Sequence, residues 1–327
     1  MKGTYHITVQ NRSLKYEFDI RRNLTLIQGD SATGKTTLID LIREYHMDKK
    51  SGINLSCSRP CRVLEGDLWK EQIQFINDSI LFIDEGSSFV ETEDFASAAK
   101  NSSNYFVIVT RANLEMLPVS VEEVYGIRSS GKYNSFEPVY HEMYRIYSTD
   151  ISSDNIPFHP EKILVEDSNS GYEFFCDIAK KNNIECESAG GKSNIYTKLS
   201  ERKSDEKLLV IADGAAFASQ MNRISRIASL KNNISLYLPE SFEWLILASK
   251  VMDDKETAEI IYDPSEYIDS TDYFSWERFF TGLLINKTQN TYLQYSKSKL
   301  NPNYLQDNTE KKILDYMESI KFDKTEK

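Results

Sequence analysis

Long apolar runs and cysteines are scarce in this sequence, and each absence excludes a class of protein. No apolar run reaches the roughly 20 residues that a membrane-spanning helix needs. Four cysteines in 327 residues are too few for a disulfide scaffold, so we expect reduced thiols. The first ten residues, MKGTYHITVQ, hold no apolar core of the signal-peptide type. We therefore expect a cytoplasmic protein that does not bind membranes.

Basic residues and histidines are also in short supply. Lysine and arginine number 39 against 50 acidic residues, which gives a net charge of −11. A protein that coats nucleic acid through a generally basic surface is thereby excluded, although a local basic groove is not. The four histidines show no triad or paired-metal spacing, and Cys57 and Cys61 have no second pair to complete a zinc site.

The strongest positive signal is a glycine loop, GDSATGKT, which fits the pattern G-x-x-x-x-G-K-[ST] in full. Glycines let backbone N–H groups wrap a phosphate, and the helix that follows points its positive end at the anion. Lys35 is then expected to reach the β- and γ-phosphates, and the Thr36 hydroxyl to ligate Mg²⁺. The expected nucleotide-binding residues are Gly29, Asp30, Ser31, Ala32, Thr33, Gly34, Lys35, Thr36, Thr37 and Arg111.

A second signal is the apolar run ILFIDE, which predicts a buried strand that ends in two acids. Asp84 at its end is expected to hold Mg²⁺, and Glu85 to act as the general base that activates water. The alternative is a buried strand that ends in solvated acids. Arg111 ends the next predicted strand, where it either senses the γ-phosphate or is a surface charge.

The order of patterns predicts an α/β protein with more than one domain. Alternation in residues 4–20, broken by the polar turn NRS, predicts an N-terminal antiparallel hairpin ahead of the glycine loop. Residues 122–147 predict a second hairpin that turns at SSGK. We assign residues 1–148 to a P-loop ATPase domain and the polar, proline-bearing residues 149–160 to a linker.

Strand and helix patterns alternate again after the linker, which predicts a smaller parallel α/β domain over residues 161–245. Residues 246–327 predict a mainly helical C-terminal extension. Glu166 and Asp213 each end an apolar strand. Because the carboxyl ends of parallel strands meet at one edge of a sheet, the two acids are expected to bind Mg²⁺ or Mn²⁺ there. Otherwise they are solvated strand ends or caps.

The hairpin, the segment NLTLIQGDSATGKTTLI and ILFIDE together resemble the additional-strand P-loop ATPases. They are most similar to the compact ATP-binding-cassette-like heads of bacterial defence and repair proteins. That family carries a serine- and glycine-rich signature ahead of the second acidic motif, and residues 37–80 contain none. The departure favours a nucleotide-gated switch over a fast motor.

The second half resembles the Toprim domain of topoisomerases, primases and the overcoming-lysogenization-defect (OLD) nucleases. The resemblance assigns the first-strand glutamate to Glu166, the later aspartate to Asp213, and the glycine-glycine-lysine-serine turn to residues 190–193. Ala215 stands where the family usually has a second Asp. The substitute ligands in reach along the sequence are Asp167, Glu173, Glu240 and Glu243.

The layout as a whole resembles OLD-type nucleases and the ATPase and Toprim components of anti-phage systems. It implies an ATP-gated, Mg²⁺-dependent nuclease with catalytic Lys35, Glu85, Glu166 and Asp213, and metal ligands that include Glu243. Its implied partners are ATP, nucleic acid, a protein effector and further copies of the chain. The alternative is a nucleotide-dependent sensor whose second domain binds only a partner protein. A small-molecule kinase is less favoured, because no lid or acceptor-binding arginine cluster is evident.

One smaller signal lies near the C-terminus, where TYLQYSKSKLNPNYL mixes tyrosines with Lys297 and Lys299. Such a stretch can stack bases and neutralise phosphates. An ordinary solvated segment with some core tyrosines has the same composition.

Overall fold

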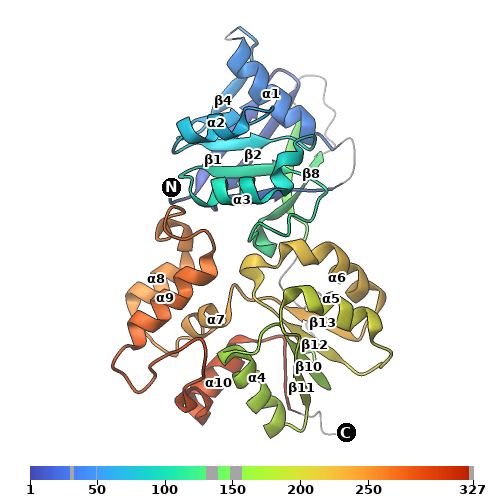
Figure 1. Ribbon diagram of the computed structural model, residues 1–327, viewed down its shortest axis with the longest axis vertical. Coiled ribbons are helices and arrows are strands. Elements are labelled where there is room, and N and C mark those ends of the chain that lie inside the picture. The colour runs from blue at the N-terminus through green and yellow to red at the C-terminus, as the bar shows by residue number, and fades with distance from the viewer. Residues whose placement is uncertain (30–32, 49, 130–138, 148–156, 324–327) are drawn as a thin grey trace. The chain divides into compact units, whose positions relative to one another are not determined.

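The computed structural model describes residues 1–29, 33–48, 50–129, 139–147 and 157–323. Contacts divide the chain into two units (Figure 1). The first comprises Met1–Tyr147 together with Pro264–Phe274, and the second Ser148–Asp263 together with Ser275–Lys327. The division after Tyr147 falls next to the expected linker, most of which lies outside the described residues. The sequence had placed residues 264–274 in the helical extension, and here they belong to the first unit.

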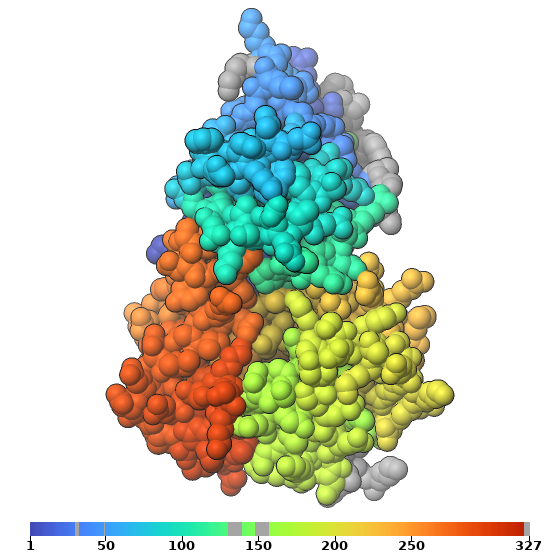
Figure 2. Space-filling view, in the orientation of Figure 1, coloured from blue at the N-terminus to red at the C-terminus, as the bar shows by residue number. Residues whose placement is uncertain are grey.

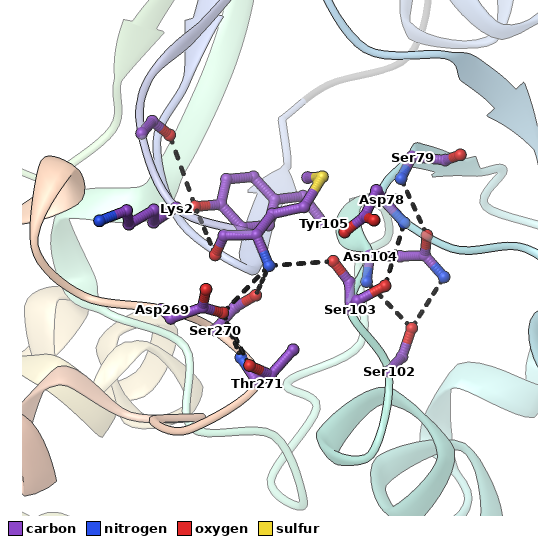
Figure 3. A network of polar contacts seen from close by, with 12 residues as sticks. Lys2, Asp78, Ser79, Ser102, Ser103, Asn104, Tyr105, Asp269, Ser270 and Thr271 are labelled. Carbon is purple, nitrogen blue, oxygen red and sulfur yellow. Dashed lines mark hydrogen bonds and ion pairs between the residues drawn. The ribbon is translucent and has the colours of Figure 1, made fainter.

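A polar network ties the segment Pro264–Phe274 to the first unit (Figure 3). The amino group of Met1 donates to Asp269 Oδ1 at 3.2 Å and to Ser270 Oγ at 2.9 Å. It also donates to the carbonyl oxygen of Ser103 at 3.3 Å. A buried ammonium group needs such partners, so these contacts account for the position of the segment.

The first unit is built on a mixed sheet. Its strands are β1 (Tyr5–Gln10), β2 (Leu14–Ile20), β3 (Leu24–Ile27), β4 (Asn54–Ser56), β5 (Cys61–Val63), β6 (Ile80–Ile83), β7 (Tyr105–Val109), β8 (Val124–Ser129) and β9 (Val139–Arg145). Across the described residues their order is β4-β1-β2-β9-β8-β3-β7-β6-β5. The antiparallel pairs β1–β2 and β8–β9 confirm both predicted hairpins, and the SSGK turn of the second lies largely outside the described residues.

Three parallel strands at the centre of this sheet set up the first candidate site. β3, β7 and β6 are fully buried and adjacent, with β7 in the middle. Ile27 pairs with Val109, and Ile83 with Ile108, so the three strands end side by side. The N–H of Thr110 donates to the carbonyl oxygen of Ile27 at 3.2 Å, which joins the end of β7 to the start of the glycine loop.

Helices pack on this sheet, and the first of them follows the glycine loop as predicted. They are α1 (Lys35–Met47), α2 (Trp69–Phe75) and α3 (Glu93–Lys100). The apolar face of α1 buries Leu38, Ile39 and Ile42 completely in a core that includes Ile7 and Val107. The glycine loop is therefore held between a buried strand and a buried helix.

The second unit contains a parallel sheet, as predicted. Its strands are β10 (Lys162–Val165), β11 (Glu185–Ser188), β12 (Leu208–Ile211) and β13 (Ile234–Tyr237), in the order β11-β10-β12-β13. Its helices are α4 (Ser170–Lys181), α5 (Lys192–Glu201), α6 (Ala218–Leu230), α7 (Phe242–Ala248), α8 (Lys255–Tyr262), α9 (Trp276–Thr288) and α10 (Asp307–Tyr316). Because β10 and β12 are neighbours, the residues that follow them meet at one edge of the sheet.

The described residues of 246–323 contain helices and no strand, and apart from Pro264–Phe274 they belong to the same unit as the parallel sheet. Figure 2 shows the red C-terminal part of this segment beside the green surface of α4 in the same unit. Lys181 of α4 pairs there with Glu310 of α10. Across the described residues, no helix combines the length and the apolar character that crossing a bilayer requires.

Candidate functional site

The described ends of the glycine loop in the first unit have backbone angles that favour glycine. Gly29 has a φ of 117° and Gly34 a φ of 93°, a region that side chains with a Cβ rarely adopt. Asp30, Ser31 and Ala32 lie outside the described residues. The two ends of the loop are thus set by glycine-specific conformations.

Lys35 begins α1 directly after the loop and is only 6% exposed. Its Nζ donates to the carbonyl oxygen of Gly29 at 2.9 Å and to Thr33 Oγ1 at 3.0 Å. The first turn of α1 contains no acidic residue, and Thr36 and Thr37 are exposed. The positive end of a 13-residue helix, an ammonium group and two hydroxyls therefore lie together, which is an arrangement suited to an anion.

Two residues that sequence reasoning missed, Tyr16 and His141, pack against the Gly34 end of the loop. The hydroxyl of Tyr16 donates to the carbonyl oxygen of Gly34 at 2.9 Å. The Tyr16 ring stacks on His141 with centroids 4.5 Å apart, and a Cβ on Gly34 would lie 2.7 Å from the Tyr16 hydroxyl. Burial raises the pKa of Tyr16 to about 12, so the hydroxyl stays protonated and keeps donating. The sequence offered only an alternating hairpin as a signal here.

The two acids after β6 lie one strand further from the loop than Arg111, because β7 separates β3 from β6. Asp84 is half-buried, and its Oδ1 accepts a hydrogen bond from the N–H of Glu85 at 2.8 Å. Glu85 Oε1 pairs with Arg111 Nε at 2.7 Å. The candidate base and the candidate phosphate sensor are therefore in contact.

The second unit has a cavity of about 160 Å³ at the carboxyl ends of β10 and β12. Glu166 follows β10, Asp213 follows β12, and both line the cavity. The N–H of Asp213 donates to Glu166 Oε2 at 3.0 Å. The structure thus brings together the two acids that the sequence had placed at neighbouring strand ends.

Other elements bring further charged groups to this cavity and its surroundings, and of these the sequence had suggested only Glu243 as a metal ligand. Glu277, in the first turn of α9, pairs with Lys297. Lys297 Nζ also lies 3.9 Å from Oε1 of Glu243 on α7. Glu243 is 1% exposed and accepts a hydrogen bond from the hydroxyl of Tyr295 at 2.9 Å. Lys297 is thus held by carboxylates, and Tyr295 is a core residue.

Positive charge offsets only part of the negative charge of the acids in this cavity. Burial raises the pKa of Glu166 to about 7, against the opposing effects of the Asp213 N–H and of Lys192. Burial also raises the pKa of Asp213 well above its ordinary value, with further contributions from Glu277 and Glu243. The pKa of Lys297 is in turn raised by Glu243 and Glu277, although burial opposes this. The residues that line the cavity include four carboxylates, Glu166, Asp167, Asp213 and Glu277, and one lysine, Lys297.

The glycine-lysine turn lies beside Glu166. The N–H of Gly191 donates to the carbonyl oxygen of Glu166 at 2.8 Å, and Lys192 Nζ donates to the carbonyl oxygen of Ala216 at 3.0 Å. Ala215 is buried where the Toprim pattern has a second Asp. Of the suggested substitute ligands, Asp167 lines the cavity. Glu173 is not among the lining residues, and it accepts a hydrogen bond from the N–H of Leu300.

The donor chemistry of the cavity fits a hard divalent cation, because Glu166, Asp213 and Asp167 offer carboxylate oxygens. Asp167 Oδ1 is buried and has no hydrogen-bond partner among the described residues. No group of three or more His, Cys, Asp or Glu side chains within that part of the chain is arranged to hold a metal ion. The oxygens for Mg²⁺ or Mn²⁺ are thus present without having converged on one point.

The comparisons with known proteins add no assignment. A scan against protein-family models finds no match, and a search of curated proteins finds no significant similarity.

Proposed function

We propose that the first unit binds ATP with Mg²⁺ and hydrolyses it as a nucleotide-gated switch. The observation that carries this proposal is Lys35, which is buried at the start of α1 directly after a loop whose two ends are glycines with positive φ. An ammonium group, free helix N–H groups and a glycine backbone are the parts that cradle the phosphates of a nucleotide.

The remaining parts of the unit support hydrolysis. Thr36 and Asp84 would hold Mg²⁺, which supplies charge for the developing transition state. Glu85 would accept the proton of the attacking water. The position of β7 between β3 and β6 agrees with the resemblance to the additional-strand ATPases.

The test is ATP binding and phosphate release with purified protein. A Lys35→Ala variant is expected to lose binding at least 100-fold and to release no phosphate, because it lacks the group that neutralises the β- and γ-phosphates. A Lys50→Ala variant, which removes an exposed lysine after α1, is the matched control and should behave as the wild type. Equal ATP affinity in wild type and Lys35→Ala would contradict the proposal.

We propose as a second candidate that the second unit cleaves phosphodiesters with a divalent cation, as the OLD-type resemblance implies for anti-phage proteins. The specific observation is the excess of carboxylates over ammonium groups in its cavity. Glu166, Asp213 and Asp167 would hold the ion, which would activate water and stabilise the charge on phosphate.

The cleavage test uses plasmid, linear DNA and total RNA with Mg²⁺ or Mn²⁺, with and without ATP. Cleavage that disappears in Glu166→Gln and changes in Lys35→Ala would support an ATP-gated nuclease. ATP hydrolysis without cleavage under any condition would instead favour the sensor alternative, in which the second unit binds a partner protein.

A further inference from the structure

Arg111 follows β7, the middle strand of three. The glycine loop follows β3 on one side of it, and Glu85 follows β6 on the other. The N–H of Thr110 is hydrogen-bonded to the carbonyl oxygen of Ile27, the residue before the loop region starts. Arg111 comes next in the chain, on the middle strand of the three. Its neighbour on the far side is Glu85, which follows β6. Arg111 can therefore serve the phosphate loop or the acid, depending on its side-chain position.

In the structure, Arg111 is paired with Glu85. Arg111 Nε lies 2.7 Å from Glu85 Oε1. The two side chains are 59% and 36% exposed, and an ion pair this exposed changes an equilibrium by up to about fivefold. Arginine binds phosphate more strongly through two parallel, charge-assisted hydrogen bonds. A phosphate within reach would therefore win the competition for Arg111.

The pair also engages the carboxylate that Glu85 would use. While the guanidinium group holds Oε1, it competes with water for the lone pairs of that carboxylate. Removing Arg111 from Glu85 frees the oxygen at the same time as the phosphate becomes bound. One side-chain movement would thus sense the nucleotide and release the base.

We propose that Arg111 exchanges Glu85 for the γ-phosphate when a nucleoside triphosphate binds, and that this exchange releases Glu85 for catalysis. The proposal rests on the proposed ATP site of the first unit. In the step that follows, the water oxygen bonds to the γ-phosphorus and its proton passes to Glu85. The bond from the γ-phosphorus to the bridging oxygen breaks, and ADP leaves with that electron pair.

The exchange predicts a competition that a double-mutant cycle can measure. Affinities for a non-hydrolysable ATP analogue and for ADP, each with Mg²⁺, are determined by calorimetry. Glu85→Gln should bind the analogue about threefold more tightly, because Arg111 no longer has to leave a carboxylate. Arg111→Ala should bind it about tenfold more weakly. ADP affinity should stay the same in both variants, since ADP lacks the γ-phosphate.

The double variant Glu85→Gln/Arg111→Ala decides the question. Its analogue affinity should equal that of Arg111→Ala, because the gain from Glu85→Gln exists only when Arg111 can move. A gain that persists without Arg111, or an equal loss of ADP affinity in Arg111→Ala, would overturn the exchange. An Arg62→Ala variant, which removes an exposed arginine of β5, is the control and should match the wild type. Wild-type protein that binds ADP and the analogue equally would refute the exchange alone, whereas protein that binds neither would refute the ATP site as well.

Discussion

Each of the two units has a lysine beside the carboxyl ends of its parallel strands, and the surroundings of the two lysines differ. Lys35 lies at the positive end of a helix, on the oxygens of Gly29 and Thr33. Lys297 lies among carboxylates, paired with Glu277 and 3.9 Å from Glu243. The first surroundings suit an anion and the second a cation. The same edge of an α/β sheet therefore acquires opposite charge preference from the residues that follow its strands.

The largest effect should come from the base of the first unit. Glu85→Gln is expected to lower phosphate release about 100-fold or more, because general-base catalysis of this kind contributes that much. ATP binding should persist, which separates this residue from Lys35. Steady-state phosphate release and nucleotide affinity together check the prediction. A Glu91→Gln variant, which alters an exposed acid after the same strand, should keep full activity.

The next effect concerns the pH dependence of the second unit. Glu166 is protonated in both the folded and the unfolded chain below its ordinary pKa of 4.5. Between pH 4.5 and about 7 only the folded chain keeps the proton, so the free energy of unfolding falls as the pH rises through this window. Above pH 7 the cost stays at about 3 kcal/mol.

A Glu166→Gln variant should remove that cost, since glutamine can still accept the Asp213 N–H and carries no charge. Without divalent metal, its thermal midpoint at pH 8 should exceed that of the wild type by several degrees, and at pH 4.5 the two should nearly coincide. Glu318→Gln, at an exposed site of the same unit, should change neither value. A lower midpoint for Glu166→Gln at pH 8 would show that the carboxylate is compensated after all.

Loss of the Lys297 ammonium group should lower the stability of the second unit, whereas Glu166→Gln should raise it. Lys297→Met leaves Glu243 buried with only the Tyr295 hydroxyl and leaves Glu277 without its partner. We expect about 2 kcal/mol of destabilisation, less than for a fully buried pair because Lys297 is partly exposed. Urea unfolding at pH 7.5 measures this, and Lys299→Met is the control at an exposed neighbour. An unchanged unfolding free energy would mean that Lys297 is not needed to balance the carboxylates.

The smallest effect should come from loss of the hydrogen bond by which Tyr16 supports the glycine loop. Tyr16→Phe removes the hydrogen bond to Gly34, which is worth about 1 kcal/mol. The result should be about a fivefold loss of ATP affinity with little change in ADP release. Tyr140→Phe, which breaks the bond from the Tyr140 hydroxyl to Glu17 instead, is the matched control. Equal affinity in Tyr16→Phe and wild type would mean that the loop holds its shape without Tyr16.

The sequence carries a fuller signal for the first candidate site than for the second, for a physical reason. A phosphate loop is made of consecutive residues whose backbone does the binding, so Gly29 to Thr37 can be recognised without a structure. Glu166 and Asp213 were predicted from strand ends alone. Glu277 and Lys297 reach the same cavity from α9 and from the segment after it, through tertiary packing that leaves no local pattern. Sequence reasoning therefore found the strand-end acids and missed the charges that surround them.

The fold, too, could be predicted only where it depends on local patterns in the sequence. Both hairpins, the parallel second sheet and most helices followed from the periodicity of apolar residues. The assignment of Pro264–Phe274 to the first unit did not, because it depends on the contacts of Met1 with Asp269 and Ser270. Strand order likewise depends on long-range pairing, and the position of β7 between β3 and β6 had to come from the structure.

The most direct measurement is a crossed titration of ATP and Mn²⁺ on three proteins: wild type, Lys35→Ala and Glu166→Gln. Calorimetry measures ATP binding in the presence of Mg²⁺, and electron paramagnetic resonance measures Mn²⁺ binding in the absence of nucleotide. The account predicts that Lys35→Ala loses ATP and keeps the Mn²⁺ site, while Glu166→Gln keeps ATP and loses the Mn²⁺ site. Loss of both ligands in either correctly folded variant, or no saturable Mn²⁺ binding by the wild type, would contradict two separate sites of opposite charge preference.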